Sequence, residues 1–205
     1  SANDALRHQA IARTKAPLLA AGTTEGYESI DALSDDYLRL IFTCCHPALA
    51  LEAQVALTLR TLVGLETDEI ARAFVVPQPT MAQRLVRAKR KIADAKIPYV
   101  VPETSEMPER LHAVLTVLYL VFTEGHRAAA GPQVIRDELC DEAIRLARLL
   151  AGLCPQDPEV LGLLALLLLT DARRGARAGE RLVLLAEQDR SLWDRAMIDE
   201  GTRVL

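Results

Sequence analysis

The residues with the clearest chemical potential form a basic segment in the middle of the chain, between Pro79 and Ile97. One acid, Asp94, stands there among six cations: Arg84, Arg87, Lys89, Arg90, Lys91 and Lys96. Over its 205 residues the chain has 24 Lys and Arg against 28 Asp and Glu, so this basic charge is local. Cations gathered on one face can neutralise phosphates, and the segment is therefore a candidate contact for nucleic acid.

Signals around this segment predict a helix-turn-helix that would position it. A helix over about residues 52–63 is followed by Gly64, a residue suited to the end of a helix. Thr67 is expected to cap the next helix, and residues 75–77 to form the turn. The basic helix should then begin near Pro79, because proline suits the first helical position.

An apolar stripe along the basic helix determines which of its side chains face outward. The stripe has the i, i+4, i+7 and i+11 spacing of a buried helix face and consists of Met81, Leu85, Ala88 and Ile92. In DNA recognition, Arg and Gln match the edges of guanine and adenine, while further cations meet phosphates. The alternative is an ordinary surface helix with a solvated basic face. DNA binding is favoured because turn, cap and charge agree.

Composition predicts an all-α fold, since half of the residues are apolar, Leu and Ala are abundant and aromatic residues are few. A helix capped by Ser34 and stopped by Pro47 should precede the helix pair. Further helices are expected after it, at about residues 109–124, 134–153 and 158–173.

The segments between these helices give weaker signals. Residues 98–108 carry three prolines and form the best candidate for an extended linker and domain boundary. Residues 174–179 should be a loop, and residues 181–187 either strand or helix. Ser191 and Asp194 have the spacing of a capping box that would open a last helix.

Other groups able to do chemistry have simpler structural interpretations. The sequence Cys44-Cys45-His46 contains zinc-ligand types, but adjacent cysteines face different ways and no second ligand pair has finger-like spacing, so core packing is favoured. Polar residues around Trp193 could form a small binding site, although capping of the last helix is favoured. No catalytic motif is present, so we expect no enzymatic activity, cofactor or metal.

The longest apolar run, residues 160–169, is about half of what a membrane span needs. We expect no membrane segment. Four cysteines without a leader pattern at the start suggest reduced thiols in a cytoplasmic protein.

Residues 52–97 (EAQVALTLRTLVGLETDEIARAFVVPQPTMAQRLVRAKRKIADAKI) closely resemble region 4 of bacterial RNA polymerase sigma factors of the extracytoplasmic-function (ECF) class. Residues 109–124 (ERLHAVLTVLYLVFTE) and 158–173 (PEVLGLLALLLLTDAR) resemble the start of a long C-terminal extension found in one ECF subgroup. Residues 4–8 (DALRH) resemble the end of region 2, the domain that melts the promoter near −10.

The resemblance implies a domain order for a chain taken from the middle of a longer protein. Residues 1–33 would be the end of region 2 and a linker, and residues 34–97 a sigma region 4 helix-turn-helix domain. Residues 98–108 would be a proline-rich linker, and residues 109–205 a truncated helical C-terminal extension.

The same resemblance implies that the basic helix reads the −35 promoter element. Carried over by position, Ala82, Gln83 and Arg87 would face bases, and Thr80 and Arg84 would lie near the DNA backbone. Additional phosphate contacts would come from Thr67, Arg90 and Lys91. An alanine can touch a thymine methyl group but cannot read a purine by hydrogen bonds.

The implied function is that of an alternative sigma factor, with promoter DNA and core RNA polymerase as partners and no chemistry of its own. The extension would regulate activity, through a possible intramolecular contact of its acidic residues with the DNA-binding domain. Two alternatives stay open. One is a helix-turn-helix regulator whose C-terminal module senses a ligand or dimerises. The other is a helical scaffold that no longer binds DNA.

Overall fold

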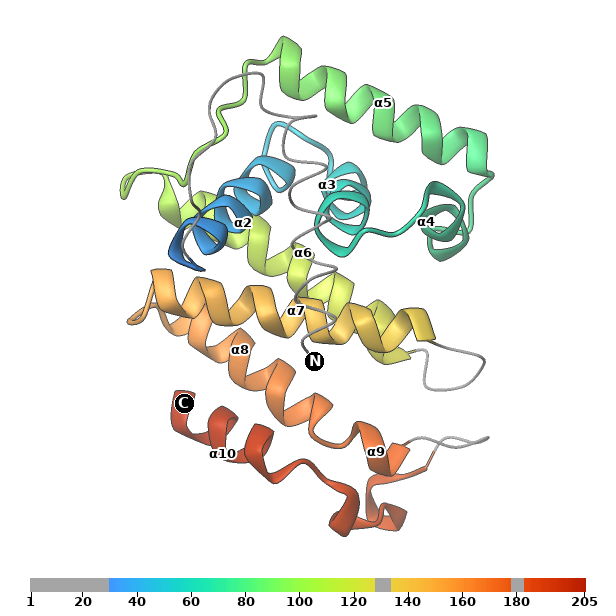
Figure 1. The fold of residues 1–205 in the computed structure, drawn as a ribbon, viewed down its shortest axis with the longest axis vertical. Coiled ribbons are helices and arrows are strands. Elements are labelled where there is room, and N and C mark those ends of the chain that lie inside the picture. Colours follow the sequence, from blue (N-terminus) through green and yellow to red (C-terminus); the bar gives the residue numbers. More distant parts are fainter. Residues whose placement is uncertain (1–29, 128–133, 178–182) are drawn as a thin grey trace. The chain divides into compact units, whose positions relative to one another are not determined.

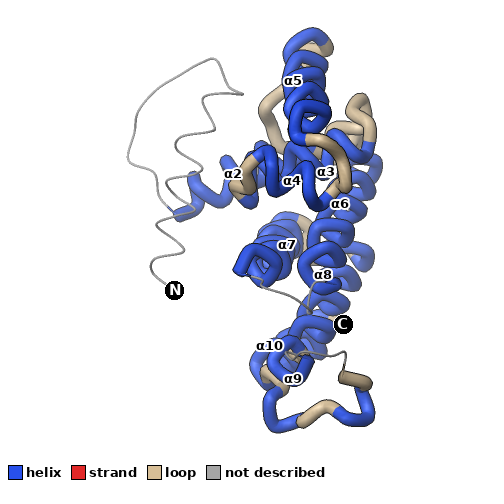
Figure 2. Tube along the Cα trace, turned by 90° about the vertical axis from the view of Figure 1, so that its right-hand side faces the viewer, coloured by secondary structure: helices blue, strands red, loops and turns tan. Residues whose placement is uncertain are grey.

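A computed structural model describes residues 30–127, 134–177 and 183–205, which include no β-strand (Figure 2). The all-α prediction is confirmed. The chain divides into two compact units, Ser1–Val117 and Leu118–Leu205. The expected end of region 2, at residues 4–8, lies outside the described residues. None of the described helices combines the length and apolar character needed to cross a bilayer.

The first unit is built around a helix-turn-helix. Its helices are α2 (Ile30–Cys44), α3 (Leu51–Thr58), α4 (Thr67–Ala73), α5 (Gln78–Asp94) and the start of α6 (Met107–Arg127). Helix α3 continues as a π-helical turn, η2 (Leu59–Val63). Helix α5 lies across the group formed by α2, α3 and α4 (Figure 1). The expected helix pair is present, but the π-helical turn was not foreseen.

The beginnings of two helices differ from the predictions. Helix α2 starts at Ile30, so Ser34 lies inside the helix and does not cap it. The N-cap of α4 is Glu66, and Thr67 is the first helical residue. The reason is local, because the Glu69 carboxylate accepts a hydrogen bond from the Glu66 backbone N–H at 2.6 Å and satisfies that donor at the helix end.

The C-caps of helices α4 and α5 are each followed by a left-handed residue that is not glycine. Val75 has φ 52° and Lys96 has φ 49°. In each case the following N–H donates back into the helix: Val76 to the Ala71 carbonyl at 3.0 Å and Ile97 to the Ile92 carbonyl at 3.0 Å. Gly64 ends η2 with φ 86°, as predicted. The turn of the helix-turn-helix is thus closed by a β-branched residue in an unfavourable conformation.

Residues after α5 pack onto α2. The Thr43 hydroxyl donates to the Pro98 carbonyl at 3.4 Å, and the Tyr99 hydroxyl donates to the Asp36 carbonyl at 3.1 Å. The buried Arg110 guanidinium donates to the Phe42 carbonyl at 2.6 Å. The expected linker therefore makes specific contacts, and the division between the units falls within α6.

The second unit contains the rest of α6 with α7 (Val134–Leu153), α8 (Pro158–Asp171) and α10 (Arg195–Val204). Helix α8 packs against both α7 and α10. Gly201 permits the close approach of α10, because a Cβ atom there would lie 3.0 Å from the Leu169 side chain.

Two predictions in this unit were wrong. The expected loop at residues 174–177 is a short helix, α9, since Arg174 bonds to the Asp171 and Asp141 carboxylates and orders it. Ser191 does not cap the last helix, which starts at Arg195 and is capped by Asp194, whose carboxylate accepts from Met197 N–H at 3.0 Å. Two single 3-10 turns precede it, η3 (Leu185–Glu187) and η4 (Arg190–Leu192).

Candidate nucleic-acid interface

The buried face of α5 is the one that its apolar spacing predicts. Met81, Leu85, Ala88 and Ile92 have exposed fractions of 0, 6, 4 and 6 %, and the helix contacts α3 and α4. Because these four side chains fix the rotation of the helix about its axis, its polar and basic residues face outward.

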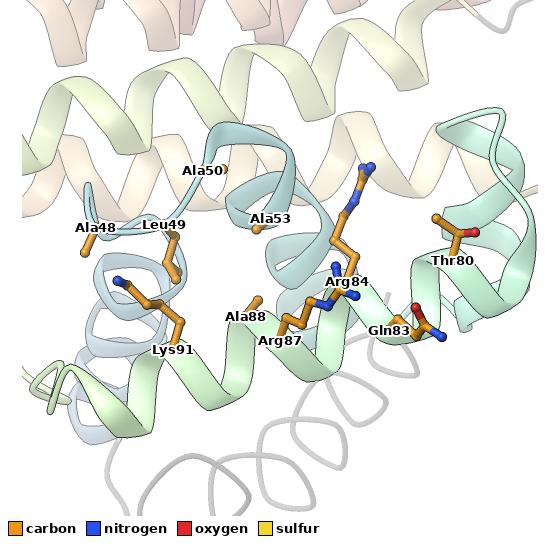
Figure 3. A pocket seen from close by; sticks show the side chains of 10 residues that line it. All are labelled: Ala48, Leu49, Ala50, Ala53, Thr80, Gln83, Arg84, Arg87, Ala88 and Lys91. Atoms are coloured by element: carbon orange, nitrogen blue, oxygen red, sulfur yellow. The ribbon is translucent and has the colours of Figure 1, made fainter.

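A groove of about 320 Å³ runs between α5 and the connection from α2 to α3. Lys91 extends toward Ala48 and Leu49, whereas Gln83 points away from that connection (Figure 3). Ten residues line the groove: Ala48, Leu49, Ala50, Ala53, Thr80, Gln83, Arg84, Arg87, Ala88 and Lys91. One wall thus consists of alanines and Leu49, and the other, apart from Ala88, consists of polar and cationic side chains of α5.

The groove brings together most of the side chains that sequence reasoning named. Five of them line it, namely Thr80, Gln83, Arg84, Arg87 and Lys91. Ala82 is exposed but does not line the groove. Arg90 is exposed and forms an ion pair with Asp94 at 3.4 Å, one turn along α5. Thr67 is partly exposed at the start of α4, apart from the groove.

The groove arginines differ in their surroundings. Arg84 forms an ion pair with Glu52 at 2.9 Å, and its guanidinium lies 5.7 Å from the centre of the Phe74 ring. Arg87 and Lys91 are exposed and have no carboxylate partner within the described part of the chain. The cations free to meet an anion in this groove are therefore Arg87 and Lys91.

Ion pairs around the short connection from η2 to α4 hold the helix-turn-helix in place. Arg60 bonds to the Glu66 carboxylate at 2.7 Å and donates to the Leu65 carbonyl at 2.8 Å. Within α4, the hydrogen bond from Arg72 at 2.8 Å lowers the pKa of Asp68. Arg60 thus ties the residues that precede α4 to η2, whereas the exposed pair of Asp68 and Arg72 acts within α4 alone.

Two residues of this region were missed by sequence reasoning. Glu52 and Phe74 hold Arg84, and neither could be paired with it from spacing, because Glu52 belongs to α3 and Phe74 is the C-cap of α4.

The neighbouring cysteines have the packing role that was favoured. Cys44 and Cys45 are free and buried, with their sulfurs 3.8 Å and 3.7 Å from the hydroxyls of Thr61 and Thr58. Burial raises the pKa of Cys44 to about 12 and that of Cys45 still further, so both stay thiols. Within the described residues, no group of three or more His, Cys, Asp or Glu could hold a metal ion.

Comparison with known families agrees with the helix-turn-helix geometry. Residues 39–92 match the family described as Sigma-70, region 4. The chain contains a sigma-70 region 4 domain. Residues 110–205 match a family of unknown function (DUF6596). The region 4 match spans α3, α4 and nearly all of α5, including every groove residue named above.

One curated relative is an uncharacterized protein, R00370, of Rhizobium meliloti (strain 1021). It is 50 % identical over 173 residues, which cover 83 % of this chain and 41 % of the relative. The chain thus spans about two fifths of the length of that relative. No solved structure matches the chain.

Proposed function

We propose that the region 4 domain binds promoter DNA at the −35 element as part of an ECF-class sigma factor. The observation that carries the proposal is α5 itself, a helix in a region 4 domain that buries one apolar stripe and leaves Gln83 and Arg87 outward. Gln83 and Arg87 would contact base edges in the major groove, since their side chains can pair with adenine and guanine at two points.

The remaining contacts would be with the DNA backbone. Thr80 and Lys91 line the groove beside α5, where a phosphate could approach them, and Arg90 and Thr67 lie farther along the same domain. Such contacts fix position and salt dependence and carry no sequence information. Ala82 would offer a thymine methyl group an apolar contact at most.

The proposal includes core RNA polymerase as the second partner and the cytoplasm as the place of action. Region 4 by itself would bind a promoter weakly, because the contacts near −10 and those with polymerase come from elsewhere. The relative that matches this chain is a longer protein, of which the match covers 41 %.

Transcription in vitro tests the proposal. The natural protein that contains this chain, mixed with purified core RNA polymerase, should give a transcript from specific promoters, and the variant Arg87→Gln should reduce it. No promoter-specific transcript, together with a footprint on a palindrome by the protein alone, would instead identify a helix-turn-helix regulator of the ordinary kind.

We further infer that the second unit regulates DNA binding by the first. Four acids of the extension could meet the basic helix, namely Asp137, Glu138, Asp141 and Glu142. Two of them are already paired inside the second unit, Asp141 with Arg174 at 2.7 Å and Glu142 with Arg145 at 2.6 Å. An inhibitory contact would then depend on acids such as Asp137, which is exposed.

The deletion that tests this inference must keep Arg110, because its bond to α2 belongs to the first unit. A chain ending at Val117, the last residue of the first unit, meets this requirement. Tighter binding of promoter duplex by the shorter chain would support inhibition by the second unit. Equal or weaker binding would count against it.

A further inference from the structure

Arg84 occupies a special place in the region 4 domain because it contacts side chains from two other helices. Its guanidinium pairs with Glu52 in the first turn of α3 at 2.9 Å and lies 5.7 Å from the ring centre of Phe74, the residue that ends α4. The Arg84 side chain is 26 % exposed, whereas that of Glu52 is 68 % exposed. One side chain of α5 thus links the recognition helix to α3 and α4.

We propose that Glu52 and Arg84 form a positioning pair, which sets the direction of α5 for base reading while Arg84 itself neutralises no phosphate. This inference rests on the proposed DNA binding by α5. Lys91, on the same groove, is exposed and lacks a carboxylate partner among the described residues.

Arg84 would have to give up two existing contacts in order to bind a phosphate. To reach a phosphate, Arg84 would have to leave both a carboxylate and an aromatic face, contacts that together satisfy a guanidinium well. The Glu52 carboxylate would then be left unpaired near the DNA backbone and would repel it. A cation without an existing partner, such as Lys91, loses nothing comparable when it binds a phosphate.

The two roles predict opposite signs for the removal of Glu52. If Arg84 contacts a phosphate, Glu52→Gln frees the arginine, removes a negative charge, and tightens DNA binding. If the pair positions α5, Glu52→Gln weakens binding even though it removes a negative charge. We expect a loss of about threefold for Glu52→Gln and of about tenfold for Arg84→Gln, which also loses the contact with Phe74.

The experiment measures binding of the whole chain to a duplex that the wild-type chain has selected from random-sequence DNA, over about 50 to 200 mM salt. For a positioning pair, Arg84→Gln keeps the wild-type slope of log K against log salt, and the double variant is no weaker than Arg84→Gln alone. Lys91→Gln is the matched control, and its slope should become shallower by about 0.9, the value for one lost phosphate contact. Glu103→Gln removes an exposed acid elsewhere in the unit and measures the general effect of charge.

Thermal melts of each variant separate loss of folding from loss of positioning, and Arg84→Lys, which keeps a cation opposite Glu52, should recover part of the affinity. Tighter binding by Glu52→Gln, or a slope shallower by about 0.9 for Arg84→Gln, would overturn the inference. If the protein gives no promoter-specific transcript with core RNA polymerase, and Lys91→Gln leaves the salt slope of duplex binding unchanged, the proposed function itself fails. The two failures are thus distinguishable.

Discussion

The turn between α4 and α5 carries a strain that a single substitution should relieve. Val75, which follows the C-cap of α4, has φ 52°, a left-handed conformation that costs an L-residue roughly 1–2 kcal/mol. Glycine adopts it freely, but its greater freedom in the unfolded chain cancels about 0.5–1 kcal/mol of the gain. The Val75 side chain is 91 % exposed, so its removal sacrifices almost no buried surface.

We therefore expect Val75→Gly to raise the free energy of unfolding by about 0.5–1 kcal/mol. The backbone bonds that close the turn, from Val75 N–H to the Arg72 carbonyl at 3.1 Å and from Val76 N–H to the Ala71 carbonyl at 3.0 Å, need no side chain and should persist. Urea denaturation followed by far-UV circular dichroism measures the change, and the melting temperature should rise by about 2–8 °C.

The matched control removes another exposed valine from a helical position. Val86 is 65 % exposed within α5, where glycine costs free energy, so Val86→Gly should lower stability by about 0.5 kcal/mol. If Val75→Gly destabilises the chain as Val86→Gly does, the left-handed turn does not store the strain inferred for it.

Three further changes probe other parts of the structure. Arg110→Ala should lower the free energy of unfolding by about 2–4 kcal/mol in urea titrations, because the Phe42 carbonyl loses its buried donor and a cavity remains. Burial and the nearby Arg177 lower the pKa of His126 to about 4 in the folded chain. Between this value and the ordinary histidine pKa of 6.5, the unfolded chain therefore binds more protons than the folded chain. Stability should fall as pH drops from about 6.5 to 4, and His126→Gln should flatten that part of the profile in thermal melts at a series of pH values. Gly201→Ala should cost about 1–2 kcal/mol in the same melts, since its Cβ would crowd Leu169 at 3.0 Å.

The Arg110 and Gly201 variants have controls in the same chain. Arg195→Ala removes an exposed arginine and should change stability by less than about 0.5 kcal/mol. Gly162→Ala, where a Cβ meets nothing within 4 Å, should instead stabilise α8 by about 0.5–1 kcal/mol. A Gly201→Ala variant that is stabilised like Gly162→Ala would contradict the close packing of α10 on α8.

Local patterns predicted the elements of the fold well where one physical effect dominated. The α5 stripe from Met81 to Ile92 was correct because burial of apolar side chains decides the rotation of an amphipathic helix. The predicted starts of helices were less accurate. Thr67 was a plausible cap, but Glu66 took that place, because the carboxylate of Glu69 reaches back to its N–H.

The features that sequence could not predict depend on contacts between distant segments. The helical turn at residues 174–177 needs Asp141 from α7 to bind Arg174, and no local signal announces that partner. Likewise, the family resemblance implied a place near the DNA backbone for Arg84, whereas its pairing with Glu52 becomes visible only once α3 and α5 pack together. Five side chains named from the sequence line the groove, but the ion pair that one of them already makes could not be predicted.

If α5 reads DNA bases through Arg87, this side chain sets the ratio of the affinities for a selected and a scrambled duplex. The wild-type chain should bind its selected duplex more tightly than a scrambled one, and Arg87→Gln should reduce that ratio by about 5- to 150-fold, the value of one two-point contact with guanine. Lys91→Gln should weaken both duplexes alike. If Arg87→Gln leaves this ratio unchanged, Arg87 does not read a base.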